Sequence, residues 1–416
     1  MLFLLSCSWS PTLVDGVNSV AVDGVDGLSC TLRADEREVH EGVVNEDGEY
    51  RLHGLLAEEV YDCSAGDVLF EVETEPLPEW IPPITLSGDP ELSSGAYTLF
   101  SHFVQEPGTG HTEQVLLIVD REGQVRWYHR LPPEIGVTDA SYTPDGQVLY
   151  GGRNGSPAIV SLSGEKLWTW DIVGQHHDIE MLPSGRVAAL VYVQYSDYLG
   201  FGVKVVDPET DELEYFIQDS ELELELPDEV EDDRDLFHAN ALHVEERHGE
   251  LVRLWVNLQH TSQLIRIQPR DRVIDLDVGP DSEWTMDGDW WEGPHDPKFS
   301  GDRVLFFDNG NAERGTRIQE VLFDEDDLQA VTSWTWSPGW FEEVWGGVAY
   351  LPDDHVLVVR GHCRTCTSEG QSALIEVDRQ GGVVWQLEFE ELSGLYRAQP
   401  LGGCDIFLNR LYCPEG

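Results

Sequence analysis

Histidines recur in this chain at one kind of position, the start of an apolar run that is typical of a buried β-strand. Three such starts carry imidazoles, and a fourth carries a guanidinium at the equivalent point. A single histidine at a strand start is most often structural, but repetition at equivalent points indicates convergence on one place. The stretches are GQHHDIE (174–180) with His176 and His177, LFHANAL (236–242) with His238 and Asn240, GPHDPKF (293–299) with His295, and LYRAQPL (395–401) with Arg397.

Converging imidazoles permit three kinds of chemistry, and the residues alone leave all three open. Histidine clusters bind transition metals, in which case Asp178 and Asp296 would be ligands or would support the ligands. Histidines also serve as general acids and bases. A neutral imidazole can act as a nucleophile while neighbouring cationic groups stabilise an anion. The sequence contains no Gly-rich phosphate loop, zincin helix or GxSxG elbow, so those enzyme classes have no support.

The elements that position these residues repeat along the chain. A strand–turn–strand unit and a hairpin that often ends in an aromatic residue each occur six times. The strand–turn–strand units begin near residues 140, 179, 241, 297, 348 and 398, and the hairpins near 119, 161, 206, 267, 323 and 377. Repeats of four strands spaced by about 40–60 residues predict an all-β fold, a six-bladed β-propeller.

The order of the units predicts how the propeller closes. The first hairpin precedes the first strand–turn–strand unit, and the last unit has no hairpin after it. The C-terminal strands should therefore complete the sheet begun by residues 96–130, which removes two free sheet edges. In a propeller the innermost strand lines a central channel, so the histidines should face one mouth of that channel.

The remaining segments divide the chain into further parts. Residues 11–85 alternate short strands with Gly and Asp turns and predict a small β-sandwich, followed by a linker at 86–95 and the propeller at 96–416. Two insertions interrupt the repeats. The acidic stretch 220–235 is expected to be a solvated loop, with a Ca²⁺ site as the alternative, and the aromatic-rich 282–293 is expected to form a wall or lid over the channel.

The charge of the chain restricts its partners. The formal net charge is −54, and Lys166, Lys204 and Lys298 are the lysines. Such a chain repels phosphate backbones, so neither nucleic acid nor an anionic membrane is an expected partner. Because the overall field opposes anions, an anionic substrate requires a local positive site.

Cysteines and the N-terminus indicate export. LLSC near the start fits a lipoprotein cleavage box with Cys7 as the lipidated residue and residues 1–10 as a truncated signal, although the apolar run is short. The other cysteines are expected to form disulfides, which predicts a periplasmic or cell-surface protein. HCRTC at 362–366 is expected to hold a local disulfide rather than a redox or zinc site. The expected pairs are Cys30 with Cys63, Cys363 with Cys366, and Cys404 with Cys413.

Four of these motifs together resemble the bacterial PAPS-independent arylsulfate sulfotransferases: HHDIEMLPSGR, HANALHV, GPHDPKFSGDRVLFFDNGN and LYRAQPL. The resemblance covers about residues 95–416 and implies a six-bladed propeller, often preceded by a β-sandwich. It implies a ping-pong transfer of a sulfuryl group from an aryl sulfate to a phenol, without a cofactor. The resemblance assigns His295 as the residue that becomes sulfurylated. His177, rather than His176, and His238 with Asn240 would hold the sulfuryl oxygens and move the phenolic proton.

One position departs from the family pattern. The family carries an arginine on the strand after the H-x-N motif, where this chain has Gln259 followed by His260. A neutral amide does not replace a bidentate guanidinium, so His260 or Arg397 would have to supply the positive charge. Two other functions stay open from the sequence: a non-catalytic exported propeller that binds a ligand or protein partner, and a metal-dependent propeller enzyme.

Overall fold

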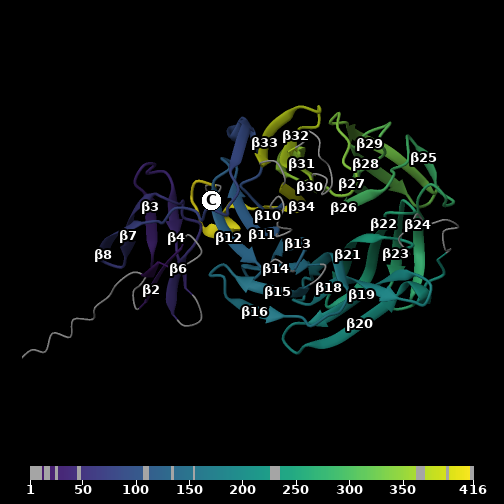
Figure 1. Ribbon diagram of the computed structural model, residues 1–416, viewed down its shortest axis with the longest axis horizontal. Coiled ribbons are helices and arrows are strands. Elements are labelled where there is room, and N and C mark those ends of the chain that lie inside the picture. The colour runs from purple at the N-terminus through teal and green to yellow at the C-terminus, as the bar shows by residue number, and fades with distance from the viewer. Residues whose placement is uncertain are drawn as a thin grey trace, which may run out of the picture.

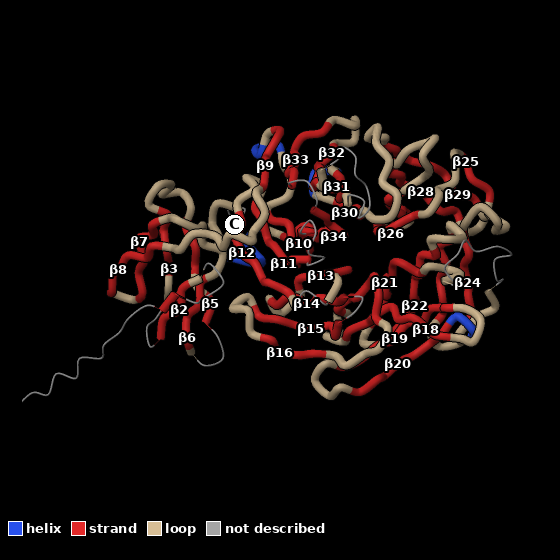
Figure 2. Tube along the Cα trace, in the orientation of Figure 1, coloured by secondary structure: helices blue, strands red, loops and turns tan. Residues whose placement is uncertain are grey.

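The computed structural model describes residues 12–13, 19–23, 27–44, 48–105, 112–132, 135–152, 155–224, 235–361, 371–389 and 393–412. Figure 1 shows two small sheets beside a ring of larger ones, and Figure 2 shows that nearly all regular structure is strand. The fold is all-β, as the sequence predicts. Short helical turns are η1 (Pro90–Leu92), η2 (Asp219–Glu221), η3 (Pro352–Asp354) and α1 (Gly403–Phe407).

The N-terminal part contains two four-stranded sheets that share one apolar core. Cys30 and Cys63 lie opposite each other on neighbouring strands and form a disulfide, which confirms that predicted pair. Cys7, Cys363, Cys366 and Cys413 and the side chain of Cys404 lie outside the described residues. The first sheet has the order β1 (Thr12–Leu13), β2 (Val20–Asp23), β6 (Glu49–Leu52), β5 (Val43–Val44), and the second β4 (Val39–Glu41), β3 (Ser29–Leu32), β7 (Val60–Ala65), β8 (Val68–Glu73).

Six larger sheets follow within the described ranges. In order from the outermost strand inward, the first contains β12 (Val125–Leu131), β11 (Thr112–Asp120), β10 (Tyr97–Gln105) and β34 (Ser393–Leu401). The next three sheets are given from the innermost strand outward. The second contains β13 (Val137–Tyr142), β14 (Gln147–Gly152), β15 (Gly155–Ser161) and β16 (Lys166–Thr169), and the third contains β17 (Gln175–Met181), β18 (Val187–Gln194), β19 (Leu199–Asp207) and β20 (Glu212–Gln218). The fourth contains β21 (Ala239–Arg247), β22 (Glu250–Leu258), β23 (Gln263–Gln268) and β24 (Val273–Val278).

The last two sheets each have a fifth strand at the outer edge. One contains β26 (Pro294–Ser300), β27 (Arg303–Asp308), β28 (Arg317–Asp324), β29 (Gln329–Trp336) and β25 (Thr285–Asp287). The other contains β30 (Gly347–Tyr350), β31 (Val356–Arg360), β32 (Ala373–Val377), β33 (Val383–Phe389) and β9 (Ile84–Gly88). Strand β9 therefore begins before, and continues into, the stretch 86–95 that the sequence suggested as a linker.

The six inner strands contact one another in a closed order: β13, β17, β21, β26, β30, β34 and again β13. Apolar cores fill the spaces between neighbouring sheets. One such core joins Leu190 and Val203 to Val256 and Ile265 of the next sheet, all of them fully buried. Because the middle strands are covered on both faces, they appear in the sequence as short continuous apolar runs.

The ring closes as predicted, but with one different element. Strand β34 pairs with β10, so residues from the two ends of the ring share a sheet. The stretch CDIFL, expected to be the partner strand of the last unit, instead lies in helix α1 and the residue after it. Ile406 and Phe407 pack into the core of the first sheet, where the Phe407 ring meets Tyr97 at 5.1 Å. Strand β10 occupies the position that a C-terminal strand would have taken.

A tight turn joins the inner strand β13 to the next strand outward, β14. In TPDGQ, the Gly146 amide donates to the Thr143 carbonyl at 3.0 Å, and Gly146 has a φ of 78°. This left-handed conformation favours glycine, which explains why the sequence motif predicts the turn so clearly.

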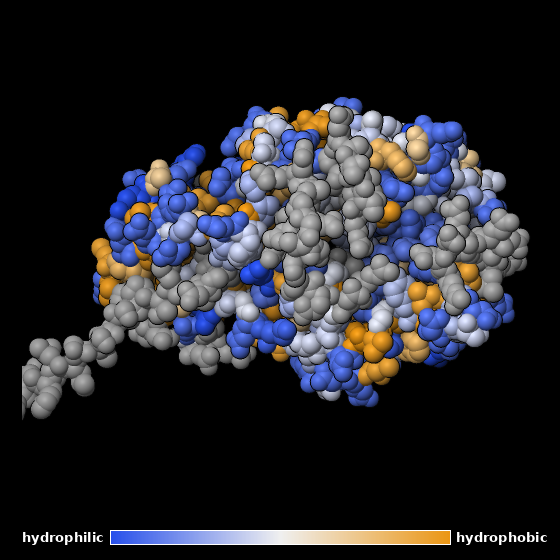
Figure 3. All heavy atoms as spheres, in the orientation of Figure 1, coloured by the Kyte–Doolittle hydropathy of each residue, from blue (hydrophilic) through white to orange (hydrophobic). Residues whose placement is uncertain are grey.

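The N-terminal sheets pack onto the first sheet of the ring. Arg126 on β12 is buried and forms ion pairs with Asp120 at 2.6 Å and with Glu38 of the N-terminal part. The face seen in Figure 3 is mostly hydrophilic, with apolar residues scattered among polar ones. Of the helices that the structure describes, none is long and apolar enough to cross a membrane.

Candidate functional site

The same backbone irregularity occurs at the start of three neighbouring inner strands. The pairing register shifts between Gln175 and Ile179, between Ala239 and Ala241, and between His295 and Lys298. At these bulges His177, His238 and Asp296 have φ values of 56°, 45° and 48°. Bulges change the direction of side chains, and left-handed non-glycine residues often gather at functional sites. The bulges explain how consecutive polar residues of one strand are brought toward the same axis.

Four histidines from two consecutive sheets come together, three from the strand starts and His260 from the turn after β22. The Nδ1 atoms of His176 and His177 are 2.7 Å apart, so one ring donates to the other. The rings of His177 and His238 meet edge to face at 4.8 Å. His260 stacks on the other side of His238, also at 4.8 Å. His176 is the outermost of the four and stacks on Tyr192 at 3.7 Å.

The pKa of His177 is held well below its usual value. Burial is the main cause, and the positive fields of His176, His238, His295 and Arg397 add to it. His177 is therefore neutral at pH 7. His295, on the following sheet, is near enough for its charge to act on His177.

Asp235 orients two of the histidines. Its carboxylate accepts from the His238 backbone N–H at 3.1 Å and from His238 Nδ1 at 2.8 Å. Its backbone carbonyl accepts from His260 Nδ1 at 2.8 Å. The pKa of Asp235 is lowered: burial acts to raise it, but the bonds from His238 outweigh that effect. An ionised carboxylate at Nδ1 leaves His238 Nε2 to exchange protons with a ligand.

His295 is 1% exposed, and its Nδ1 lies 2.7 Å from the side-chain oxygen of Asn309. Burial lowers the pKa of His295 to about 4, even though the bond to Asn309 acts in the opposite direction. The His295 ring is therefore a neutral imidazole at pH 7, as a nucleophilic role requires.

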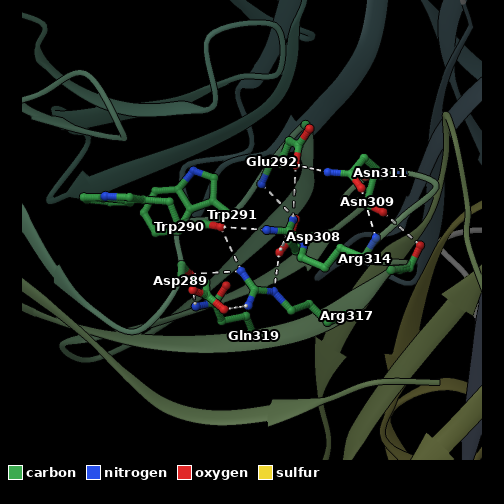
Figure 4. Close-up of polar contacts among 12 residues, drawn as sticks. Asp289, Trp290, Trp291, Glu292, Asp308, Asn309, Asn311, Arg314, Arg317 and Gln319 are labelled. Atoms are coloured by element: carbon green, nitrogen blue, oxygen red, sulfur yellow. Dashed lines mark hydrogen bonds and ion pairs between the residues drawn. The ribbon is translucent and has the colours of Figure 1, made fainter. Parts of the chain in front are cut away.

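An ion-pair network fixes the segments on either side of His295 (Figure 4). Buried Asp308 accepts from Arg314 at 2.8 Å, from Arg317 at 2.6 Å and from the Glu292 backbone at 2.8 Å. The Arg317 guanidinium also donates to the carbonyls of Asp289 and Trp290. The network ties the segment that enters β26 to the end of β27.

The aromatic stretch 282–293 packs into its own sheet, and the expectation that it forms a wall or lid over the channel is wrong. Trp291 is 1% exposed, stacks on Phe306 at 4.3 Å and donates to the Ser262 carbonyl at 2.7 Å. Strand β25 from the same stretch pairs with β29 at the outer edge of the sheet. Burial of the large apolar rings explains this placement.

Asn240 supports the site rather than opening toward it. It is fully buried, and its Nδ2 donates to the Pro294 carbonyl at 2.9 Å. Its Oδ1 accepts from Asn257, which also donates to Pro294 O at 2.7 Å. The two amides hold the backbone just before His295, so the expected contact with sulfuryl oxygens is not what this geometry favours.

Three acidic side chains surround the Arg397 guanidinium. It pairs with Asp178 at 2.6 Å, Asp296 at 3.2 Å and Asp139 at 3.4 Å, and it also donates to the Asn240 carbonyl at 2.6 Å. Despite burial, these neighbours raise the pKa of Arg397, which stays charged. Its charge is largely offset by these partners, so the sequence-based expectation that it serves the substrate as a cation is weakened.

Gln259 lies in the turn after β22. Its backbone N–H donates to the His238 carbonyl at 3.2 Å, and its side chain lies against Gly293, two residues before His295. The structure therefore brings Gln259 and His260 to the histidine group, as the sequence alignment suggested.

A cavity of about 500 Å³ opens at a different level of the inner strands. It is lined by later residues of these strands, including Glu180, His243, Lys298 and Phe299. His177, His238 and His295 are not among its lining residues, whereas Arg397 and its partners Asp139, Asp178 and Asp296 line it. Within the described ranges, no group of three or more His, Cys, Asp or Glu residues is placed to hold a metal ion.

Two residues of the site were missed from the sequence. Asp235 ends the acidic insertion, which was interpreted as a solvated loop, and only its spacing of three residues from His238 sets it apart from its neighbours. Asn309 lies in the turn motif DNGN, which was interpreted as a turn alone. Residues 225–234 of the insertion, where a Ca²⁺ site was considered, lie outside the described residues.

Comparisons with solved structures find matches at low sequence identity. A Myceliophteria thermophila Cps50 (Swd1) β-propeller domain is 13% identical, with 74% of this chain and 87% of that chain covered and a TM-score of 0.43. A nidogen/laminin complex is 11% identical, with coverages of 74% and 100% and a TM-score of 0.45. Kuenenia stuttgartiensis hydrazine synthase is 11% identical, with 61% of this chain and 66% of that chain covered and a TM-score of 0.40. No curated protein matches.

A family model gives the more specific result. The model described as Arylsulfotransferase (ASST) matches residues 97–397, which contain every histidine of the site together with Asn240, Gln259 and Arg397. The match extends from the first strand of the ring, β10, into its last, β34. It confirms the resemblance seen in the four sequence motifs, and this chain belongs to the arylsulfotransferase family.

Proposed function

We propose that this protein transfers a sulfuryl group from an aryl sulfate to a phenol, without PAPS, through a covalent intermediate on His295. The observation that carries the proposal is a buried, neutral His295 whose Nδ1 is bonded to Asn309 and which is within electrostatic range of His177 and His238. Family membership makes a sulfotransferase reaction the natural chemistry for such a group.

In the first half-reaction, the lone pair of His295 Nε2 attacks the sulfur atom. The new N–S bond forms as the bond between sulfur and the aryl oxygen breaks, and the electron pair leaves with that oxygen. Protonated His238 donates its Nε2 proton to the aryl oxygen as this bond breaks, so that this oxygen leaves as a phenol, a better leaving group. The Asp235 carboxylate stabilises the protonated form of His238 before this transfer.

In the second half-reaction, the phenolic acceptor gives its proton to His238 Nε2 and its oxygen attacks sulfur. The electrons of the N–S bond return to His295 Nε2, which restores the starting enzyme. Neutral His177 lies beside His238, and an N–H at its Nε2 would be suited to bind a sulfuryl oxygen, whereas the Nδ1–H of His260 is already bonded to the Asp235 carbonyl. Because acidic neighbours offset the positive charge of Arg397, the imidazoles provide most of the groups that can stabilise the negative charge of the sulfate.

The number of propeller blades, the N-terminal β-sandwich and the cellular location are part of the same proposal. The six sheets whose inner strands form a closed ring would be the blades of a six-bladed β-propeller, and the two N-terminal sheets a β-sandwich. The Cys30–Cys63 disulfide fits an oxidising compartment. We therefore propose an exported, periplasmic or cell-surface enzyme that is lipid-anchored at Cys7.

A chromogenic aryl sulfate tests the proposed function directly. The purified protein should release phenolate without added PAPS, and much faster when a phenol is present to discharge the intermediate. The His295→Asn variant should lose about 10³-fold or more of this rate because it lacks the nucleophile.

His248→Asn is the matched control for this experiment. His248 is an exposed turn residue with a φ of 53°, a conformation that asparagine tolerates, so this variant should keep the wild-type rate. A wild-type rate in His295→Asn, or a strict requirement for PAPS, would contradict the proposal.

A further inference from the structure

The side chain of Asn309 connects His295 to a facing segment of the chain. Asn309 is 2% exposed and follows directly after Asp308 of the network in Figure 4. Its Nδ2 donates to the Glu342 carbonyl at 2.8 Å and to the Trp345 carbonyl at 3.0 Å. Its Oδ1 lies 2.7 Å from His295 Nδ1.

These three contacts determine which nitrogen of His295 carries the proton. Backbone carbonyls only accept hydrogen bonds, so the two near Asn309 require its NH₂ group and exclude the flipped amide. The amide oxygen must then face His295, and because this oxygen also only accepts, the His295 Nδ1 must donate. In the neutral ring the lone pair is consequently on Nε2.

We propose that Asn309 is a positioning residue that fixes His295 in the Nδ1–H tautomer and keeps that proton in place after the ring is sulfurylated. The inference rests on the proposed function, which assigns the nucleophile, and adds to it the residue that selects the reacting nitrogen.

Because the Asn309 side chain is neutral, it affects the protonation of the sulfurylated His295 ring. Sulfurylation at Nε2 while Nδ1 keeps its hydrogen gives an N-sulfoimidazolium, and the amide oxygen of Asn309 is too weak a base to remove that proton. Attack by the acceptor phenol then expels a neutral imidazole, which is a good leaving group. A carboxylate at the same position would draw the proton away, so the leaving group would be an imidazolide and the second half-reaction would be slower.

Asn309 also holds its own loop, and a test must separate the two roles. The Thr316 hydroxyl donates to the Asn309 carbonyl at 3.0 Å and accepts from the Glu342 backbone at 2.7 Å. Thr316 thus joins the same two segments as the Asn309 amide, and no contact between Thr316 and His295 is present among the described hydrogen bonds. Thr316→Val is therefore the matched control for loosening of the loop.

The experiment records ¹⁵N-histidine NMR spectra and phenolate-release rates for Asn309→Leu and Thr316→Val. The His295 signal is assigned by its loss in His295→Asn. The wild type and Thr316→Val should show a protonated Nδ1 and an unprotonated Nε2. Asn309→Leu should lose this pattern, and its rate should fall by up to about 10⁴-fold, the effect of a wrong histidine tautomer in Ser-His-Asp enzymes.

Asn309→Asp provides a second test that does not depend on the leucine variant folding. One carboxyl oxygen can still accept from His295 Nδ1, while the other must be protonated to face two carbonyls, so the tautomer signal should survive. Equal signals and rates in Asn309→Leu and the wild type would overturn the inference, as would loss of the signal in Thr316→Val. If the wild type shows the signal but transfers no sulfuryl group, the proposed function fails and the tautomer assignment stands.

Discussion

At the scale of single residues, the site separates two kinds of imidazole by their partners. His295 is bonded to a neutral amide, and burial keeps its pKa at about 4. His238 Nδ1 lies 2.8 Å from the carboxylate of Asp235, whose lowered pKa keeps it ionised. Neighbouring groups whose environments differ in this way can divide the roles of nucleophile and acid/base catalyst between them.

Replacing Asp235 by Asn should reveal the acid/base role of His238. The amide retains a hydrogen-bond acceptor but removes the negative charge that favours protonated His238. We expect about a 10²-fold slower release of poor leaving groups such as unsubstituted phenol. Release of 4-nitrophenolate should change little because this leaving group needs no proton. The measurement is a plot of the rate against the leaving-group pKa, and an equal loss for all donors would contradict the assignment.

The sequence predicted the histidines of the site but not their partners. The residues before the inner strands are visible because they recur at equivalent points of a repeat. Asp235 and Asn309 could not be recognised in the sequence, because Asp235 looks like part of a solvated acidic loop and Asn309 like an ordinary turn residue. Arg397 was predicted at a strand start, but it lies within β34, and its three acidic partners come from three other strands. Only tertiary structure shows that its charge is already paired.

At the scale of elements, the bulges at the starts of β17, β21 and β26 matter more than the strands themselves. Period-two alternation would place His295 and Asp296 on opposite faces. With the bulge, Asp296 takes a left-handed conformation, His295 bonds Asn309 and Asp296 reaches Arg397. The strand–turn–strand pattern predicts these strands well, whereas the bulges leave no clear mark in the sequence. Helix α1 was also missed, since the apolar residues that dock it suit a strand equally well.

The segment that leads into β26 should behave as part of the core. Trp291→Ala removes a ring that stacks on Phe306 and leaves the Ser262 carbonyl without that donor. We expect a loss of about 3–5 kcal/mol in the free energy of unfolding, measured in urea. Val173→Ala, at a side chain that is 85% exposed, should change it by less than about 0.5 kcal/mol. Unchanged stability of Trp291→Ala with a raised KM would instead support the lid interpretation.

At the scale of the whole molecule, charge repulsion is the dominant long-range term. Acidic residues number 79 against 25 Lys and Arg, which gives the net charge of −54. Salt weakens both this repulsion and exposed ion pairs such as Arg33 with Asp62. Exposed pairs contribute little, about 0–1 kcal/mol each, so the repulsion between the excess carboxylates should decide the net effect of salt.

The melting temperature should therefore rise with salt. Between low salt and about 1 M NaCl, where the screening length falls to about 3 Å, we expect an increase of several degrees in a calorimetric scan. KCl at the same ionic strength should give the same rise if screening is the cause. A melting temperature that falls with added NaCl would show that ion pairs outweigh the repulsion.

Because the net negative charge of the protein repels an anionic substrate, groups close to His295 must offset the negative charge of the sulfate. The cationic residues of the inner strands are paired with carboxylates, as Arg397 and Lys298 show. An aryl sulfate must then be held by the imidazole N–H groups beneath a surface that repels it. The central claim is that these imidazoles surround a nucleophile and are not merely a packed cluster.

Mass spectrometry of the rapidly quenched protein tests this claim most directly. The protein is mixed with an aryl sulfate in the absence of acceptor, quenched under alkaline conditions and digested. We predict a mass gain of one SO₃ group on the peptide that contains His295, lost when phenol is added before quenching. No adduct during active turnover, or an adduct on another residue that forms equally in His295→Asn, would contradict the account.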